Sequence, residues 1–340
     1  NDYNWLDTTG RCDGAPCDSA DNVSHGTHTM GTMVGTDGGE NQIGMAPGAK
    51  WIEANGCDTC ADAALLSAGE WMMAPTDAQG ENPDASKRPQ IINNSWGSSA
   101  AGSIDDWYKD ITDGWAASGM FGVWSAGNAG PQCQTTSSPG ANTANYSVGN
   151  YQSNGTISTL SSRGTGEDGE IKPNIAAPGS NIRSAVVGSQ YGNLSGTSMA
   201  APHVSGAVAL LWSASPSLVG DIEGTVENNN VFGEGKLDVM AMLDAAPGQE
   251  SGTVEGTVAN ADGEAVSGAD VTIVNGDFSR TVTTDTDGQY SVKVPGGETT
   301  VTASAFGYAS STQTVTVAAE ESVTADFELS PAATHTVSGT

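Results

Sequence analysis

The chain has 340 residues, which is enough for two domains with separate cores. Its 40 acidic residues against 11 basic ones give a formal net charge of -29, spread along the sequence. This charge makes nucleic acid and anionic membranes poor partners, and no stretch reaches the roughly 20 apolar residues of a membrane span. Acidic residues that are spread evenly favour a salt-adapted protein, because salt screens the repulsion between them. The alternative is an ordinary acidic secreted protein.

The five cysteines indicate an oxidising compartment. Cys12 with Cys17 and Cys57 with Cys60 are close enough in sequence for short-loop disulfides, which leaves Cys133 without a mate. For the second pair we favour a loop staple over a redox motif, since no thioredoxin-like strand precedes it, and over zinc, since a second C-x-x-C is absent. The chain begins at Asn1 without Met or a signal peptide, which suggests a mature form or a fragment.

Residues 1–247 alternate short apolar runs with stretches of helical spacing. "WIEANG" (51–56), "QIINNSWG" (90–97), "MFGVWSAGN" (120–128) and "NYSVGN" (145–150) predict strands, whereas residues 61–74 and 103–119 predict helices. This alternation predicts an α/β fold with a doubly wound, mostly parallel sheet. Functional residues of such a sheet follow the carboxyl ends of its strands.

Residues 248–330 have a different texture, with Val and Thr alternating with polar residues between Gly- and Asp-rich turns. They predict a small antiparallel β-sandwich that serves as an accessory module, followed by a tail at 331–340. The acidic turn "DTDG" (285–288) supplies only part of a calcium loop, so we interpret it as turn chemistry.

Ser198 lies in "LSGTSMAAPHVSGAVALLW", between a glycine-containing turn and a helix of small apolar residues. A helix N-terminus presents unpaired N–H groups that favour negative charge, including an oxyanion that develops beside a serine. Ser198 is therefore a candidate nucleophile. The alternative is a simple helix N-cap, a common role of serine.

A nucleophilic serine needs a base, and the chain has four histidines: His25, His28, His203 and His335. His335 is in the tail, and His203 follows Ser198 on the same helix and faces away from it. His25 opens a helix in "SHGTHTMGTMVG" and is the candidate base, whereas we expect His28 in the core. A metal-binding His25–His28 pair is disfavoured because no further ligand lies nearby.

Asn128 ends a predicted strand in "GVWSAGNAG" and can donate to an oxyanion. Together "HGTH", "AGN" and "GTSMAAPH", in this order, resemble the subtilisin-like serine peptidases, and "NDYNWLD" with "AALLSAGEWMMAPTD" resembles the bacillopeptidase F group of that family. The order excludes an α/β-hydrolase, whose histidine follows its serine.

The resemblance covers residues 1–247 and implies roles for further residues. "NNSWG" looks like the strand that pairs with substrate, which implies substrate contacts at Ser95, Trp96 and Gly97. Ser125, Ala126 and Gly127, with "SSPGAN" (137–142) as a wall, would form the specificity pocket. No cofactor is required; structural calcium is common in the family, but we can name no ligands for it.

The family's catalytic aspartate follows a hydrophobic strand in a D-[ST]-G turn some thirty residues before the histidine, by resemblance. Asp7 in "WLDTTG" imitates this motif, but it is only 18 residues ahead of His25, and "NDYNW" does not look like a buried strand. We therefore expect the acid and its strand to lie upstream of Asn1. Loss of this residue costs ~3 × 10⁴ in kcat in subtilisin, so the chain as given should be nearly inactive. A second departure from the family is a shortened segment near residues 216–230.

The leading hypothesis is a secreted, monomeric serine endopeptidase that acts on peptide or protein substrates. The rival is an inactive pseudo-peptidase, or surface binding module, that works through its sandwich domain, which resembles carboxypeptidase regulatory-like domains. Retention of His25, Asn128 and Ser198 argues against the rival, because a decayed site need not keep all three.

Overall fold

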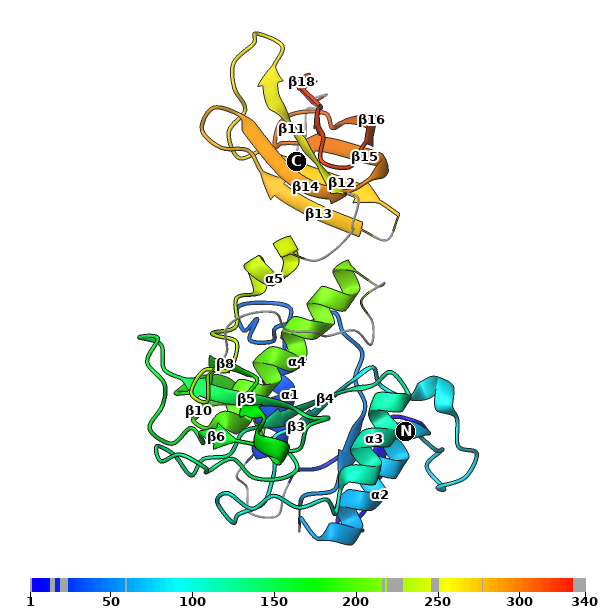
Figure 1. Cartoon of the computed structure of the whole chain (residues 1–340). Helices are drawn as coiled ribbons and strands as arrows, with labels where there is room; N and C mark the ends of the chain where they lie inside the picture. The colour runs from blue at the N-terminus through cyan, green and yellow to red at the C-terminus, as the bar shows by residue number, and fades with distance from the viewer. Residues whose placement is uncertain are drawn as a thin grey trace. The chain divides into compact units, whose positions relative to one another are not determined.

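The computed structural model describes residues 2–12, 16–18, 24–58, 60–215, 218, 229–245, 251–276 and 278–332. The chain divides into two compact units, Asn1–Ala245 and Ala246–Thr340 (Figure 1). The shortened segment expected near residues 216–230 and most of the expected tail lie outside the described residues.

The first unit is built on a parallel four-stranded sheet in the order β3-β4-β5-β8. Its strands are β3 (Ile91–Asn94), β4 (Phe121–Ser125), β5 (Tyr146–Tyr151) and β8 (Ile175–Pro178). The expected strands at 90–97, 120–128 and 145–150 are thus confirmed.

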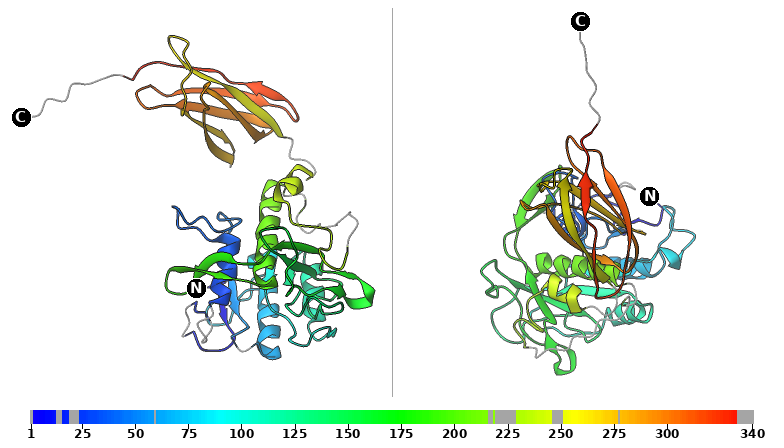
Figure 2. Two further views of the ribbon diagram at one scale, coloured as in Figure 1. Left: turned by 90° about the vertical axis from the view of Figure 1, so that its left-hand side faces the viewer. Right: turned by 90° about the horizontal axis from the view of Figure 1, so that it is seen from above.

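Helices cover both faces of this sheet, as expected for a doubly wound fold (Figures 1 and 2). Helix α4 (Thr197–Ala214) packs on one face and shares a buried cluster with Val123. Helices α2 (Asp62–Met73) and α3 (Lys109–Ala117) pack on the other face around Trp124. Adjacent residues of β4 therefore point to opposite apolar layers, which explains why its sequence is a continuous apolar run.

The sequence pattern predicted a helix from Ser103, but helix α3 begins at Lys109. The backbone ahead of it is tied to another loop: Asp105 N donates to Ser138 Oγ at 2.9 Å, and Asp105 O accepts from Asn142 Nδ2 at 2.9 Å. In a helix that began at Ser103, Asp105 O would accept from the N–H four residues later, so its bond to Asn142 replaces a bond of that longer helix.

Two further strands, β1 (Trp5–Asp7) and β2 (Glu53–Asn55), pair in parallel as a separate sheet. Residues 2–4 form a turn and only Trp5 of "NDYNW" is buried, so the expectation that this stretch is not a buried strand is confirmed. A three-residue strand, Trp5–Asp7, begins at its last residue, where the chain pairs with β2. Helix α1 (His25–Val34) packs against α4 and β9.

The remaining elements of the unit are short. They are β6 (Gly164–Thr165), β7 (Ile171–Lys172), β9 (Ile182–Val186), β10 (Gln190–Leu194), α5 (Val239–Ala245) and the 3₁₀ turns Ala85–Lys87 and Glu167–Gly169. Disulfides join Cys12 to Cys17 and Cys57 to Cys60, as the spacing predicted, and Cys133 is exposed without a disulfide.

The second unit has two β-sheets around one apolar core, consistent with a β-sandwich. One sheet contains β11 (Ser251–Asn260), β14 (Gln289–Pro295), β17 (Ser322–Thr324) and β18 (Phe327–Leu329); the other contains β12 (Asp270–Asn275), β13 (Phe278–Thr283), β15 (Gly297–Ser304) and β16 (Ser311–Val317). Most pairs are antiparallel, but β17 and β18 run parallel to β11. In "DTDG", Asp285 Oδ1 accepts from Asp287 N and Gln289 N, which fits the turn interpretation.

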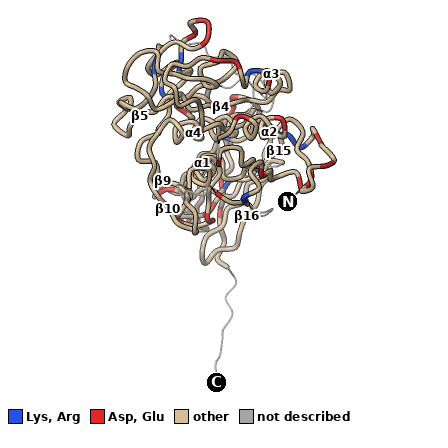
Figure 3. Tube along the Cα trace, turned by 90° about the horizontal axis from the view of Figure 1, so that it is seen from below, with Lys and Arg blue, Asp and Glu red and all other residues tan. Residues whose placement is uncertain are grey.

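Acidic residues occur along many segments of the described trace and far outnumber basic ones (Figure 3). Several carboxylates accept hydrogen bonds from backbone and side-chain N–H groups of their own turns. Hydrogen bonds from the Asn82 side chain and Glu81 N lower the pKa of Asp77, and bonds from the Asn41 side chain and Gly39 N lower that of Asp37.

Candidate active site

Ser198 is the second residue of α4, and Gly196 occupies the N-cap position, so the N-cap interpretation of Ser198 was wrong. Two reciprocal hydrogen bonds connect it to the end of β3. Ser198 Oγ donates to Ser95 O at 3.1 Å, and Ser95 Oγ donates to Ser198 O at 2.8 Å. The hydroxyl is thus held in the first turn of the helix, where N–H groups without an intrahelical partner concentrate.

Asn128 follows β4 and is fixed by the residue before Ser198. Its Oδ1 accepts from Thr197 N at 2.9 Å and from Thr197 Oγ1 at 3.0 Å. A backbone N–H can only donate, so the bond to Thr197 N decides which end of the amide is oxygen. The amide Nδ2 is left as the donating end.

Gly127 allows the chain to turn between β4 and Asn128. Its φ is +100°, and a β-carbon there would lie 2.9 Å from Ser162 Oγ. Only glycine fits this combination of conformation and space without strain. Its N–H donates to Thr197 Oγ1 at 3.2 Å, which makes Thr197 the common anchor of this loop.

A pocket of about 140 Å³ gathers eight of the nine site residues that the sequence predicted. Its lining includes the candidate nucleophile Ser198, the amide Asn128 and the six predicted substrate-binding residues, Ser95, Trp96, Gly97, Ser125, Ala126 and Gly127. Ser137 of the expected "SSPGAN" wall also lines it.

His25, the ninth residue, lines a larger cavity of about 1130 Å³. Both cavities are lined by Ser95, Trp96 and Gly97. This segment is therefore shared by the cavity of His25 and the pocket of Ser198. Helices α1 and α4, which carry the two residues in their first turns, pack against each other. Among the described residues, the hydroxyl of Ser198 is bonded to Ser95 O and not to His25.

Burial lowers the pKa of His25 below its usual 6.5, and the negative charge of Asp18 opposes this effect. This shift favours the neutral imidazole, which is the form a general base needs. Asp18 also accepts from Thr27 N at 2.9 Å, so it caps the first turn of α1 from outside the helix.

Glu53 is a second carboxylate beside this turn. A β-carbon on Gly26 would lie 3.5 Å from Glu53 Oε1 and 3.7 Å from Asp18 Oδ1. Burial, followed by the charge of Asp18, raises the pKa of Glu53 to about 7. Neither Asp18 nor Glu53 was predicted from the sequence. The signal that could have pointed to Asp18 is its place within ten residues ahead of "HGTH".

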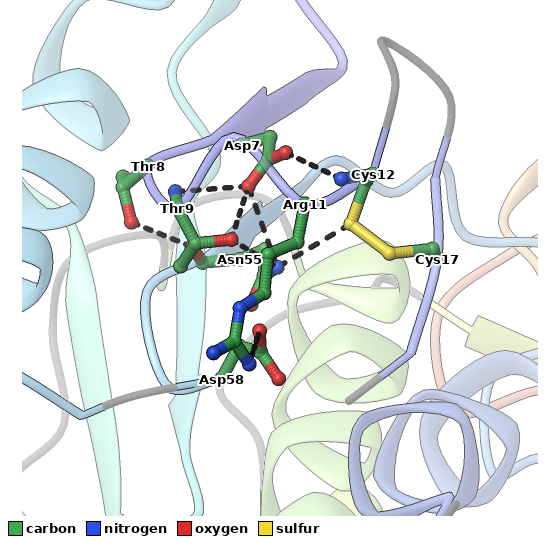
Figure 4. Close-up of a disulfide and its surroundings, with 8 residues drawn as sticks. All are labelled: Asp7, Thr8, Thr9, Arg11, Cys12, Cys17, Asn55 and Asp58. Carbon is green, nitrogen blue, oxygen red and sulfur yellow. Dashed lines mark hydrogen bonds and ion pairs between the residues drawn. A yellow bond between two sulfur atoms is a disulfide. The ribbon is translucent and has the colours of Figure 1, made fainter. Parts of the chain in front are cut away.

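The carboxylate of Asp7 is engaged within its own turn, as Figure 4 shows. Thr9 N and Cys12 N donate to it at 2.9 and 2.8 Å, and Thr9 Oγ1 donates at 2.7 Å. These hydrogen bonds lower the pKa of Asp7 although burial raises it. Asp7 does follow a strand, but it is not among the residues that line the cavity of His25.

The other described histidines have structural partners. His28 is fully buried, as predicted, and its Nε2 contacts Ile182 O at 2.9 Å; His203 Nδ1 contacts Met199 O at 2.8 Å within α4. Within the part of the chain that the structure describes, no three His, Cys, Asp or Glu side chains form a cation site, so we assign no calcium ligands.

The sequence profile of the subtilase family matches residues 4–240. The chain belongs to the subtilase family. This subtilase also matches the carboxypeptidase regulatory-like domain over residues 253–330. It is 44% identical to Bacillopeptidase F of Bacillus subtilis over 228 residues, which are 64% of this chain and 15% of that protein.

Other curated relatives from Bacillus subtilis are more distant. Serine protease AprX is 30% identical over 67% of this subtilase and 59% of its own length, and Subtilisin E is 28% identical over 65% and 56%. The chain thus spans less than two thirds of each of these three proteins.

Solved structures support the fold of this subtilase. Fervidolysin from Fervidobacterium pennivorans, described as a keratinolytic enzyme related to subtilisin, matches 90% of the chain with a TM-score of 0.52 at 21% identity, over 53% of its own chain. The prenylagaramide maturation protease PagA matches 73% with a TM-score of 0.53 at 22% identity, over 95% of its own chain. Among the described residues, no helix has the length and apolar character to cross a membrane.

Proposed function

We propose that this subtilase is a secreted serine endopeptidase in which Ser198 attacks the peptide carbonyl. His25 takes the hydroxyl proton and returns it to the leaving amine. Asn128 Nδ2 and the Ser198 N–H stabilise the oxyanion. The supporting observation is that Asn128 lines the same pocket as Ser198, and that Thr197 anchors Asn128 Oδ1 and so leaves Nδ2 free of that contact to donate.

Substrate would lie extended along Ser95, Trp96 and Gly97 and add a strand beside them. One substrate side chain would enter the pocket that Ser125 lines. The acidic coat favours neutral or cationic peptides and a salt-rich medium, although high salt weakens the preference. The enzyme would act as a monomer.

Labelling with a fluorophosphonate in molar KCl tests the nucleophile. We expect a chain extended at its N-terminus by an apolar strand that ends in D-[ST]-G to be labelled at Ser198, and Ser198→Ala to abolish the label. Ser195→Ala is the matched control, because it removes an exposed hydroxyl three residues away and should leave labelling unchanged. Failure to label the extended chain would instead favour a binding module.

A further inference from the structure

Lys172, in β7, is the one lysine or arginine of the described residues whose side chain is fully buried. Its ammonium is surrounded by oxygens. Nζ donates to Asn145 O at 2.7 Å and to Asn174 Oδ1 at 3.1 Å, and it lies 3.4 Å from Glu170 Oε2. We call these three atoms the oxygen cradle. An ammonium has three N–H donors, so the cradle matches it in number.

The lysine side chain is fixed along its whole length. A β-carbon on Gly166 would lie 2.7 Å from Lys172 Cγ and 2.4 Å from Ala141 O, so the stem passes through a tightly packed space. Burial lowers the pKa of Lys172, and the charges of Glu170 and Glu167 oppose this effect. A buried charge is costly unless its partners compensate it, which the oxygen cradle does here.

One side of the pocket that Ser198 lines is formed by residues 137–145, which we call the pocket wall. Ser137 lines the pocket. A β-carbon on Gly140 would lie 2.8 Å from Ser125 O, so the pocket wall closely approaches a second pocket residue. The position of the wall therefore determines the space that is available to a bound side chain.

The two ends of the pocket wall are held by different kinds of contact. Near its start, Ser138 N donates a neutral hydrogen bond to Ser103 O at 2.9 Å. At its other end, Asn145 O accepts from the Lys172 ammonium, and Asn145 Nδ2 donates to Pro139 O at 2.6 Å. A hydrogen bond with a charged donor is roughly twice as strong as a neutral one. The lysine thus acts on the wall through Asn145.

We propose that Lys172 is a positioning residue of the pocket, a cation of the chain itself that fixes the pocket wall and so determines how tightly a substrate side chain binds. A carbonyl, an amide oxygen and a carboxylate are ligands that proteins offer to hard cations. The oxygen cradle should therefore accept a small ammonium ion when the lysine side chain is removed. The role in substrate binding rests on the proposed peptidase function, whereas the cradle and its effect on the wall do not.

Hydrogen exchange of the full chain in molar KCl tests the oxygen cradle. Lys172→Ala removes the part of the side chain that n-propylammonium can replace, whereas Lys172→Met keeps a stem that leaves this ion no space. In both variants the amides of the pocket wall should exchange at least ~10-fold faster than in the parent, because the buried oxygens lose their donor. Added n-propylammonium chloride should restore the protection in Lys172→Ala alone.

Three controls accompany this test. Tetramethylammonium chloride has the same charge but no N–H group and should restore nothing. Lys293→Met makes the same change at an exposed position of the second unit and should leave the pocket wall unchanged. Glu170→Gln weakens the oxygen cradle without emptying it and should accelerate exchange by a smaller factor, which decides the question if circular dichroism shows that the lysine variants are unfolded.

Three outcomes would overturn the oxygen cradle. The first is parental exchange of the pocket wall in the folded variants of Lys172 and Glu170. The second is equal recovery of Lys172→Ala and Lys172→Met in n-propylammonium, and the third is recovery of neither.

Hydrolysis of a peptide p-nitroanilide by the extended chain of the labelling test connects the cradle to substrate binding. Lys172→Met should raise KM about 3–10-fold and change kcat less than about 2-fold, because the wall contacts the substrate side chain and not the reacting atoms. A substitution that only reduced the folded fraction would lower the apparent kcat and leave KM unchanged.

An unchanged KM together with faster exchange of the pocket wall overturns the role in substrate binding. An extended parent chain that hydrolyses nothing refutes the proposed peptidase function instead, and the exchange results still decide whether the oxygen cradle holds the wall.

Discussion

Asn128 and Thr197 illustrate how single side chains determine the chemistry of the pocket. Thr197 accepts from Gly127 N and donates to Asn128 Oδ1, so one hydroxyl positions both the turn and the amide. Together they fix the orientation of an amide that lines the same pocket as Ser198. The consequences of changing them can be measured as changes in kcat and KM, on the extended chain of the labelling test.

We expect Asn128→Ala to lower kcat by about 10²–10³ with little change in KM, the magnitude known for an oxyanion donor of a subtilisin. Thr197→Val keeps the side-chain shape but removes the hydroxyl, and should lower kcat by a smaller factor because Thr197 N still holds Asn128. Peptide p-nitroanilide hydrolysis gives both constants. A KM effect without a kcat effect would contradict the oxyanion role.

Glu53 should make stability depend on pH. Its folded pKa, about 7, is above the ordinary value of 4.5 because burial disfavours its charged form. The stability gained from this shift is present below pH 4.5 and is lost as the pH rises through about 7. Glu53→Gln should therefore raise Tm relative to the parent more at pH 8.5 than at pH 5. The exposed Glu81→Gln serves as control; an equal effect of Glu53→Gln at both pH values would contradict the burial.

At the scale of elements, glycines let other segments approach α1 and α4 closely: β9 lies against Gly31 of α1, and Met45 lies against Gly206 of α4. A β-carbon on Gly31 would lie 2.5 Å from Ser184 Oγ, and one on Gly206 would overlap Met45 Cβ. Met45 cannot retreat easily, since its N–H is bonded to Thr32 O at 3.0 Å. The "HGTHTMG" and "HVSGA" stretches therefore owe their glycines to close packing.

Gly206→Ala should destabilise the first unit by about 1–3 kcal/mol through overpacking. Gly114→Ala in α3 is the matched control: its β-carbon would meet Met73 Sδ at 3.1 Å, and this flexible side chain can move. Alanine also has a better helix propensity than glycine, which stabilises the helix by up to about 1 kcal/mol. Urea unfolding of both variants separates the two effects, and equal destabilisation would refute the close-packing explanation.

At the scale of the whole molecule, the net charge of -29 and the scarcity of cations dominate. Among the described residues the ion pairs are Arg11–Asp58, Lys109–Asp113 and Lys172–Glu170, so most acidic residues have no cationic partner. Their mutual repulsion opposes the compact state in both units and is screened by salt.

We therefore expect Tm to rise between 0.1 M and 3 M KCl, measured by circular dichroism. Sodium chloride should act similarly if screening is the cause. No change in Tm over this range would contradict salt adaptation, even if the peptidase chemistry is correct.

The sequence by itself determined the parallel sheet, the separate β-rich unit and the two short disulfides, because these depend on local periodicity and spacing. It also singled out Ser198 and Asn128, since one begins a predicted helix and the other ends a predicted strand, whereas the six pocket residues came from the resemblance to the subtilisin-like peptidases. Only the tertiary structure showed that Asp105 shortens α3, that Trp5–Asp7 is a strand, and that Asp18 and Glu53 flank the first turn of α1. It alone revealed the larger cavity, which residues of β2 and β3 line together with His25. These features arise from contacts between residues far apart in the sequence, whose energies outweigh local preference and leave no periodic signal.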